Sequence, residues 1–231
     1  MKRLGIVCGV KAEEAALGLL LDDVAVKAAV SGASPEKAQD LAHDLVATHG
    51  CTALLSFGVS GALSAALTPG DMVLARAVIL RDGTRIEAAR NMTQRLSERA
   101  AAAGLTLKHV DMADAAAVIG DAAAKRALGV KTGAHAVDLE SGAVADVARQ
   151  AGVPFAALRT ISDAADQTLP HAALGAIGPG GDIRVLTTLA RLARRPQDLP
   201  AMVRLAAGSA RGFKSLRRCA RDLLPALVGV V

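Results

Sequence analysis

Aromatic residues are almost missing from this 231-residue chain, which contains three phenylalanines and no tryptophan or tyrosine. Its core must therefore be packed from small aliphatic side chains, which supply most of the 52% apolar content. A flat ligand finds few rings to stack on. Sequence-tolerant binding of single-stranded nucleic acid relies on aromatic stacking, so we do not expect that function here.

Cysteine is scarce as well, with only Cys8, Cys51 and Cys219 in the chain. Their number is odd, their spacing is long and no CxxC motif occurs, so neither a disulfide framework nor a metal site is expected. Cys8 and Cys51 lie in apolar, strand-like runs, where buried free thiols are common. This pattern predicts a reduced, cytoplasmic protein.

Long apolar runs are also lacking. No stretch reaches the ~18 residues that a membrane-spanning helix needs. The first residues, Met1-Lys2-Arg3, precede an apolar run as in a signal peptide, but Lys11, Glu13 and Glu14 interrupt that run too early. We therefore expect neither a secretion signal nor a membrane span.

Charge is present but unevenly placed. The net charge is +5, and its excess lies in the tail. Between Arg184 and Arg221, only Asp198 opposes a set of ten basic residues: Arg184, Arg191, Arg194, Arg195, Arg204, Arg211, Lys214, Arg217, Arg218 and Arg221. The rest of the chain is near neutral. This asymmetry predicts a basic C-terminal extension over about 180–231.

Apolar runs alternate with helical patterns along most of the chain. We expect strands at 4–10, 24–30, 53–57, 72–79, 105–112, 134–139 and 153–161, and helices at 12–21, 35–49, 91–103, 121–128 and 142–151. This order predicts one α/β domain over 1–231. Its expected architecture has three layers: a central mixed, mostly parallel sheet between helices, with the basic helical extension after Pro179-Gly180-Gly181.

Polar residues gather where the predicted strands end: Glu13, Gly58–Gly61, Asp138 with Glu140, and Arg159–Asp163. In an open α/β sheet, ligands bind outside the carboxyl ends of the strands. The sequence therefore predicts one site that these four clusters share.

Three blocks that hold these clusters, in this order, resemble a known family. "GIVCGVKAEE" (5–14), "SFGVSGALSAALTPGDMV" (56–73) and "AVDLESGAVADVARQAGVPFAALRTISDAAD" (136–166) are similar to the nucleoside phosphorylase and methylthioadenosine/adenosylhomocysteine nucleosidase superfamily. The tail, "DQTLPHAALGAIGPGGDIRVLTTLARLARRPQDLPAMVRLAAGSARGFKSLRR" (166–218), resembles its hopanoid-biosynthesis branch. The branch implies removal of adenine from adenosylhopane, and the family implies no cofactor.

Cleavage of a bond between adenine and ribose needs an acid for the leaving base, because an adenine anion leaves poorly. The resemblance implies that Asp163 is this acid and protonates N7, with Ser162 orienting it. A free aspartic acid titrates near ~3.9, so burial or a proton shared with the base must keep Asp163 protonated. A simpler alternative is that Ser162 and Asp163 cap a helix.

The family pattern also implies the residues that hold the sugar. Glu140 matches the glutamate that accepts hydrogen bonds from the ribose hydroxyls, Leu139 stands where relatives usually have methionine, and Asp138 replaces a common glutamate. Each acid has an alternative: Glu140 also begins a helix, and Asp138 could be a solvated strand-end acid.

The water or phosphate that attacks the sugar must also be activated or bound by residues of the site. Glu13 matches the glutamate that activates water in nucleosidases, although a helix-start acid has the same appearance. Gly58, Ser60 and Gly61 match a glycine-rich loop whose backbone N–H groups approach an anion or the sugar.

Two departures from the family pattern affect the expected reaction. Phosphorolytic relatives place arginines in the first and glycine-rich loops, where this chain offers only Lys11. Arg159 reads as a partner of Asp163 or Asp166 in a structural ion pair. Phosphate therefore stays a candidate co-substrate, and we favour hydrolysis.

The second departure concerns the base. Relatives place an aromatic ring near 114–118, where this chain has Ala115-Ala116-Ala117. We expect Phe155 or another residue to contact adenine instead.

The tail has helical spacing of apolar residues among arginines at 186–203 and 202–216, followed by the apolar residues 223–231. Such helices bind anionic membrane surfaces, which predicts peripheral contact with the inner membrane face; packing on the core is the alternative. Nucleic acid is not an expected partner, and relatives imply a homo-oligomer. Two competing functions are a general methylthioadenosine/adenosylhomocysteine nucleosidase and a catalytically degenerate membrane-surface binding module.

Overall fold

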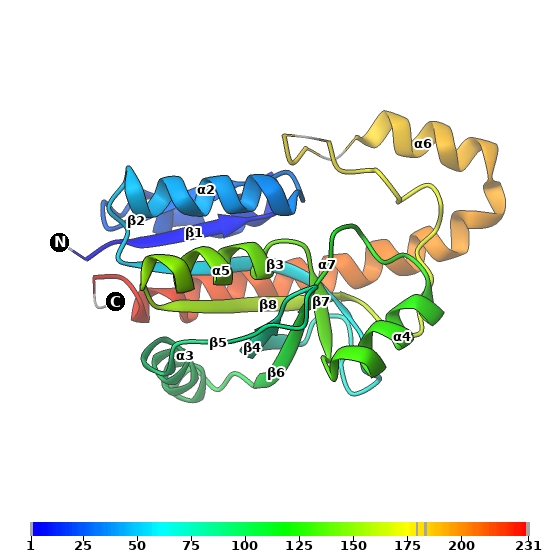
Figure 1. The fold of residues 1–231 in the computed structure, drawn as a ribbon. Coiled ribbons are helices and arrows are strands. Elements are labelled where there is room, and N and C mark those ends of the chain that lie inside the picture. The colour runs from blue at the N-terminus through cyan, green and yellow to red at the C-terminus, as the bar shows by residue number, and fades with distance from the viewer. Residues whose placement is uncertain (1, 179, 183, 230–231) are drawn as a thin grey trace.

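The described chain, residues 2–178, 180–182 and 184–229 of a computed structural model, folds around an eight-stranded mixed sheet (Figure 1). For Leu186, only the backbone is described. The strands are β1 (Leu4–Cys8), β2 (Val26–Val30), β3 (Ala53–Ala62), β4 (Met72–Ile79), β5 (Arg85–Glu87), β6 (Leu107–Asp114), β7 (Ala136–Asp138) and β8 (Phe155–Asp163). The predicted strand at 72–79 is confirmed at both ends.

The sheet has the order β2-β1-β3-β7-β6-β4-β5, and β8 pairs with both β3 and β4. Five of these pairings are parallel, whereas β3 with β7, β4 with β5, and β4 with β8 are antiparallel. The pairing of β3 with β8 shifts register between Ser60 and Gly61. This irregularity lies beside Ser162 and Asp163, at the end of the strand where the predicted site falls.

Helices cover both faces of the sheet. The helices are α1 (Lys11–Ala16), α2 (Pro35–Ala47), α3 (Arg90–Ala102), α4 (Ala122–Thr132), α5 (Ser141–Ala151), α6 (Val185–Arg194) and α7 (Leu199–Asp222), with short 3-10 turns at Gly18–Asp22, Pro196–Asp198 and Leu224–Ala226. Helices α2 and α5 pack on one face, and α1, α3 and α7 pack on the other. The predicted three-layer α/β architecture is confirmed.

Local sequence signals explain where several helices begin and end. Ser34 caps α2 by accepting a hydrogen bond from the Lys37 backbone N–H at 3.3 Å, with Pro35 in the first turn. Gly152 ends α5 in the left-handed conformation, with φ 67°.

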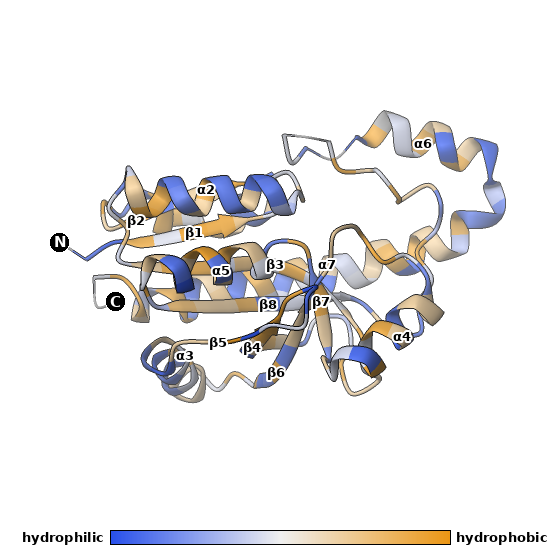
Figure 2. Ribbon diagram, viewed as in Figure 1, coloured by the Kyte–Doolittle hydropathy of each residue, from blue (hydrophilic) through white to orange (hydrophobic). Residues whose placement is uncertain are grey.

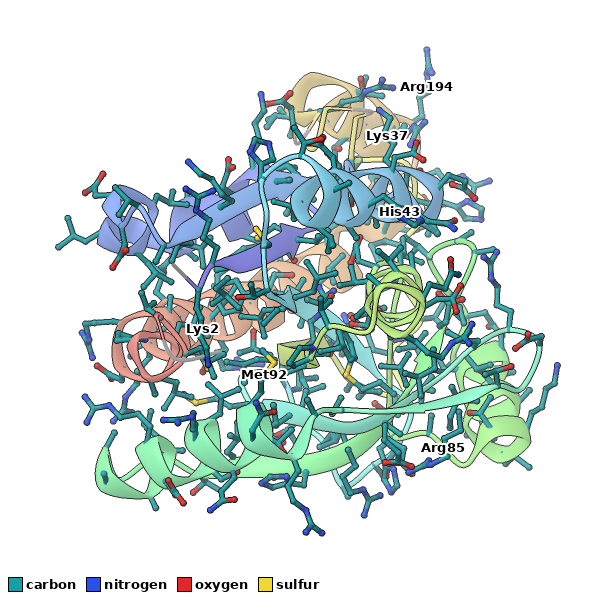
Figure 3. The ribbon with its side chains drawn as sticks, turned by 60° about the vertical axis from the view of Figure 1, so that its left-hand side comes forward. Lys2, Lys37, His43, Arg85, Met92 and Arg194 are labelled. Atoms are coloured by element: carbon teal, nitrogen blue, oxygen red, sulfur yellow. The ribbon has the colours of Figure 1, made fainter. Side chains whose placement is uncertain are left out.

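Two apolar cores lie on opposite faces of the sheet, and the hydropathy colouring shows the strands as their apolar centre (Figure 2). Met92 of α3 is fully buried in one of them (Figure 3). The same core contains Leu216, Leu223, Leu224 and Leu227, all fully buried. The apolar end of the tail is therefore part of the core as far as Leu227, and it is not free to face a membrane; residues 230–231 lie outside the described chain.

Helix α7 reaches the sheet through two glycines. A Cβ atom on Gly208 would lie 2.5 Å from the Ser162 carbonyl oxygen, and one on Gly212 would lie 2.9 Å from that of Ile161. The Thr160 hydroxyl donates to the Gly212 carbonyl at 2.9 Å. The tail thus touches β8 next to the predicted acid.

Helix α6 behaves differently from α7. It lies away from the sheet (Figure 1), and Arg194 projects from its outer edge (Figure 3). Val185 and Leu189 on α6, and Leu199 and Val203 in the first turns of α7, are all more than half exposed. No helix in the described part of the chain is both long and apolar enough to cross a membrane.

Candidate active site

A cavity of about 270 Å³ opens where the strand ends meet α7. Its lining includes residues from all four predicted clusters: Glu13, Val59, Ser60, Gly61, Asp138, Leu139, Glu140, Ser162 and Asp163, together with Gly9 from the first loop. The structure brings these four separate polar clusters together around one cavity.

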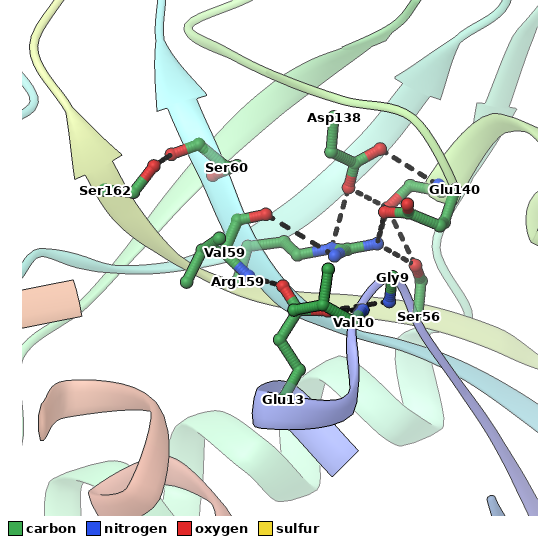
Figure 4. A network of polar contacts seen from close by, with 11 residues as sticks. Gly9, Val10, Glu13, Ser56, Val59, Ser60, Asp138, Glu140, Arg159 and Ser162 are labelled. Atoms are coloured by element: carbon green, nitrogen blue, oxygen red, sulfur yellow. Dashed lines mark hydrogen bonds and ion pairs between the residues drawn. The ribbon is translucent and has the colours of Figure 1, made fainter. Parts of the chain in front are cut away.

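Arg159 lies among the acids at the strand ends and contacts two of them, Asp138 and Glu140 (Figure 4). Its side chain is fully buried, with Nε 2.7 Å from Asp138 Oδ2 and Nη2 3.2 Å from Glu140 Oε2. It also donates to the Ser56 hydroxyl. Burial by itself lowers the pKa of Arg159, but the Asp138 and Glu140 carboxylates outweigh it, so the pKa is raised and the guanidinium stays charged.

The predicted ion pair of Arg159 with Asp163 or Asp166 is wrong. Residues 159 and 163 belong to one extended strand, β8, and four residues of strand span ~13 Å. The guanidinium instead reaches the acids at the end of β7.

Glu140 sits on this cation at the start of α5 and is 4% exposed. Burial raises the pKa of Glu140 to about 8; Arg159 opposes the shift, and Asp138 and Glu13 add to it. A Cβ atom at Gly9 would lie 2.6 Å from Glu140 Oε1, so the first loop can approach this carboxylate only because residue 9 is glycine.

Glu13 is held almost entirely by backbone. Its carboxylate accepts hydrogen bonds from the N–H groups of Gly9 at 2.6 Å, Val10 at 3.0 Å and Val59 at 2.7 Å. Burial raises its pKa, against the effects of Arg159 and these bonds. A carboxylate offers about four acceptor positions, so roughly one is left for a molecule in the cavity.

The glycine-rich segment predicted as a loop is strand. Residues 58–61 continue β3, and the chain can do so because Gly58 has no side chain. A Cβ atom there would clash with Glu13 Oε1 and lie 2.5 Å from Arg159 Nη1. Gly58 itself does not line the cavity; it makes room for the two side chains that form its floor.

Asp163 ends β8 and is 7% exposed. Its Oδ1 accepts a hydrogen bond from the Ser162 hydroxyl at 2.7 Å, as expected of an orienting serine. The alternative in which this pair caps a helix is wrong, because both residues belong to the strand and, in the described part of the chain, no helix follows before α6. Its Oδ2 pairs with the ammonium group of Lys125, a partner that the sequence reasoning missed.

The walls that would face a base are aliphatic. Ala117, Val118 and Ile119 line the cavity, and the only ring among the described residues of its lining is Phe213 of α7. Phe155 lies at the opposite end of β8 from Asp163, 3% exposed in the α2–α5 core, so the structure does not bring this predicted base contact to the cavity.

The described lining of the cavity has no group of cations that could hold a phosphate. Among the described lining residues, Lys125 is the only cationic one, and it is paired with Asp163. Lys11 forms an ion pair with Asp182 at 3.0 Å instead. Within residues 2–178, 180–182 and 184–229, no cluster of three or more histidine, cysteine, aspartate or glutamate side chains is placed to hold a metal ion.

The cavity thus contains a buried aspartate, Asp163, and a buried glutamate that contacts a cation, Glu140, which are residue types that acid–base catalysis and charge stabilisation can use. The family model of the phosphorylase superfamily matches residues 6–195. The chain therefore belongs to this superfamily and is an enzyme of the nucleosidase or nucleoside phosphorylase class.

Solved structures support the same fold. Futalosine hydrolase of Helicobacter pylori strain 26695 is 18% identical, with 97% of each chain covered and a TM-score of 0.76. The 5′-methylthioadenosine/S-adenosylhomocysteine nucleosidase of Campylobacter jejuni is 18% identical over 100% of both chains, with a TM-score of 0.76. A putative enzyme of that name from Francisella philomiragia is 18% identical over 100% of both chains, with a TM-score of 0.75. No curated protein sequence matches this chain significantly.

Proposed function

We propose that this enzyme hydrolyses the N-glycosidic bond of an adenine nucleoside whose 5′ carbon bears an apolar group, with adenosylhopane as its substrate. The observation that carries the proposal is the mixed lining of the cavity. Its acidic half is the set of carboxylates Glu13, Asp138, Glu140 and Asp163, and its apolar half is the set Val118, Ile119, Leu169, Ile177, Leu205 and Phe213.

The acidic half fits the sugar and the reacting bond. In this proposal Glu140 accepts hydrogen bonds from the ribose hydroxyls, and Asp163 protonates adenine N7 as the bond to C1′ breaks. Glu13 then takes a proton from the water that attacks C1′. Three carboxylates around the sugar also favour the positive charge that develops on it. The reaction needs no cofactor.

Water is favoured over phosphate because the lining is acidic. A phosphate dianion beside Glu13, Asp138 and Glu140 would meet like charge, and the cation beneath them, Arg159, is already occupied by two of these acids. The names of the similar structures, a hydrolase and nucleosidases, agree with this choice.

The apolar half fits a hydrocarbon substituent. A volume of about 270 Å³ lies just below the ~300–1,000 Å³ usual for small-ligand pockets, so a nucleoside fills it and a polycyclic lipid must extend outside. Val118 and Ile177 at the rim are 49% and 37% exposed, which gives the hydrocarbon an apolar exit.

The reaction is tested by measuring adenine release from adenosylhopane and from methylthioadenosine, each with and without phosphate. Phosphate-independent release with a preference for adenosylhopane supports the proposal. Release only with phosphate would make the enzyme a phosphorylase. Preference for methylthioadenosine would instead favour the general nucleosidase, and absence of release from either would favour a catalytically degenerate binding module.

The proposal also places the exposed face of α6 and early α7 against an anionic membrane. Val185 and Leu189 are four residues apart on α6, and Leu199 and Val203 are four residues apart on α7; all four are exposed. Arg184, Arg194, Arg195 and Arg204 are exposed on the same two helices or next to them. Apolar residues among arginines are the pattern that an anionic lipid surface binds.

This contact is tested with vesicles that contain anionic lipid. Leu189→Ser with Val203→Ser should reduce co-sedimentation several-fold and leave cleavage of methylthioadenosine unchanged. Leu19→Ser with Val24→Ser is the matched control, because Leu19 and Val24 are 87% and 69% exposed and lie before β2. Equal co-sedimentation of the two double variants would refute the assigned membrane-binding face. If the wild-type protein self-associates as its concentration rises and the Leu189→Ser, Val203→Ser variant does not, the face binds a second copy of this chain instead.

A further inference from the structure

Lys125 is a lysine buried in the wall of the active-site cavity. It lies in the second turn of α4 and is 1% exposed, although α4 is otherwise a surface helix with no other buried residue. Burying an ammonium group is costly unless it is fully paired. Its position beside the reacting bond therefore calls for an explanation beyond packing.

All three donors of Lys125 are used. The ammonium pairs with Asp163 Oδ2 and donates to the carbonyl oxygens of Ala164 and Gln167, each at 3.0 Å. These partners belong to β8 and the segment after it. The lysine thus fixes both the carboxylate of the proposed acid and the backbone next to it.

This pairing conflicts with the simplest role for Asp163. A general acid must donate a proton, but Asp163 Oδ2 itself accepts a hydrogen bond from the Lys125 ammonium group. The contact therefore offers the lysine as the source of the proton that the base needs.

We infer that Lys125 is a positioning residue that holds the proton which Asp163 delivers to the leaving adenine. The inference rests on the proposed glycosidic cleavage. As the bond from C1′ to N9 breaks, its electron pair goes to adenine, N7 takes a proton through Asp163, and Asp163 takes one from Lys125. Lysine becomes a neutral amine, and solvent returns the proton when the emptied cavity admits water.

The two carbonyls suit the neutral amine as well as the ammonium. An amine has two N–H donors and one lone pair. The donors match the Ala164 and Gln167 carbonyls, and the lone pair is left for the Asp163 side. When Asp163 passes the proton on to N7, its carboxylate loses the lysine donor, keeps the Ser162 hydroxyl and gains the N7–H of adenine as a donor.

Among the described residues around the cavity, no other cation could take over this role. The further charged groups in the lining are the carboxylates Glu13, Asp138 and Glu140, and Arg159 beneath them holds two of these acids. Asp121 and Arg126 on α4 and Asp166 after β8 are exposed, and α7 contributes the uncharged Leu205, Ser209 and Phe213.

The test is the pH profile of kcat for the wild-type enzyme and two variants, with whichever of the two nucleosides the wild-type enzyme cleaves. Wild-type kcat should persist to alkaline pH, because ammonium groups hold protons longer than carboxyl groups do. Lys125→Met should lower kcat at neutral pH by about 10²-fold and recover tenfold for each pH unit toward acid, as Asp163 itself becomes protonated.

Lys125→Arg keeps the positive charge but cannot release a proton. It should be as slow as Lys125→Met at neutral pH, without the recovery in acid. A rate near wild type for the arginine variant would show that charge alone suffices and would overturn the inference. A loss in Lys125→Met that is equal at every pH would reduce the lysine to a structural role.

Circular dichroism and the unfolding midpoint show whether each variant is folded. If the methionine variant does not fold, the arginine variant decides. Adenine release by the wild-type enzyme supports the proposed function whatever the variants do, so the two proposals fail separately.

Discussion

Arg159 and Lys125 are the buried cations beside the cavity in the described chain, and they differ in their surroundings. Arg159 contacts Asp138 and Glu140, the acids proposed to hold the sugar, and is not part of the cavity lining. Lys125 lines the cavity and contacts one carboxylate, which is the proposed acid. An arginine cannot lose its proton in a protein, whereas a lysine can. In the proposed reaction, this difference gives Arg159 the role of a fixed charge near the sugar and Lys125 the role of a proton source near the base.

Removing the acid gives the largest expected effect. Asp163→Asn should lower kcat by about 10²–10⁴-fold, because the amide cannot pass a proton to N7. KM should change by less than about threefold, since the sugar contacts are untouched. Steady-state kinetics measure both, and a near-normal kcat would remove Asp163 from its role.

Removing the fixed charge should act on stability. Arg159→Met leaves the Asp138 carboxylate buried without a counter-charge and should cost about 3–5 kcal/mol of unfolding free energy. Arg149→Met is the matched control, because Arg149 pairs with Asp146 on the exposed side of α5 and should cost under about 1 kcal/mol. Urea unfolding compares the two; equal losses would contradict the structural role of Arg159.

Moving α7 away from β8 should have a smaller effect. Gly208→Ala places a methyl group against the Ser162 carbonyl and should destabilise the protein by about 1–3 kcal/mol, although alanine favours helix. Gly129→Ala in α4 is the control: its Cβ would meet its nearest atom at 3.4 Å, so the helix preference should stabilise it by up to about 1 kcal/mol. Urea unfolding measures both changes, and the opposite sign in either variant would contradict the close approach.

The smallest effect concerns pH and the sugar. The pKa of Glu140 is about 8 in the free enzyme, so its carboxyl group is mostly protonated at pH 7 and ionises as pH rises. Ribose hydroxyls donate hydrogen bonds to the ionised form of Glu140. The affinity for the nucleoside is therefore proportional to the fraction of Glu140 that is ionised. Kd for an adenine nucleoside should therefore decrease by up to about tenfold between pH 7 and 9. A 2′,3′-dideoxy analogue, or Glu140→Gln, should abolish this dependence.

Much of the fold was accessible from the sequence because its signals are local. The strand at 72–79 is a nearly continuous apolar run, and Ser34-Pro35 marks the start of α2 with a cap and a fixed φ. The extent of β3 was not accessible. Glycine at 58 and 61 usually indicates a loop, and only the side chains of Glu13 and Arg159 explain why glycine is needed within this strand.

The residues of the site likewise include some that the sequence points to and some that it does not. Glu13, Glu140, Ser162 and Asp163, which all line the cavity, could be proposed from the sequence because each stands in a block that resembles the family. Lys125 could not, since a lysine in an alanine-rich helix has the pattern of a solvated face, and its partners are 38 or more residues away in sequence. Phe213 could not be predicted as a cavity residue either, because the helical spacing of apolar residues in the tail does not show which side of the helix faces the cavity.

Gly208 and Gly212 of α7 restrict insertions and deletions in the tail more than they restrict substitutions. Each residue added to a helix turns the rest of that helix by ~100°. One insertion ahead of Gly208 would therefore rotate alanine or arginine side chains into the Ile161 and Ser162 carbonyls and carry Ser209 and Phe213 out of the cavity wall. Substitutions on the exposed side of α7 should be tolerated, whereas single-residue insertions and deletions between α6 and Gly208 should not, so alignments of this segment are expected to vary in residues and not in spacing.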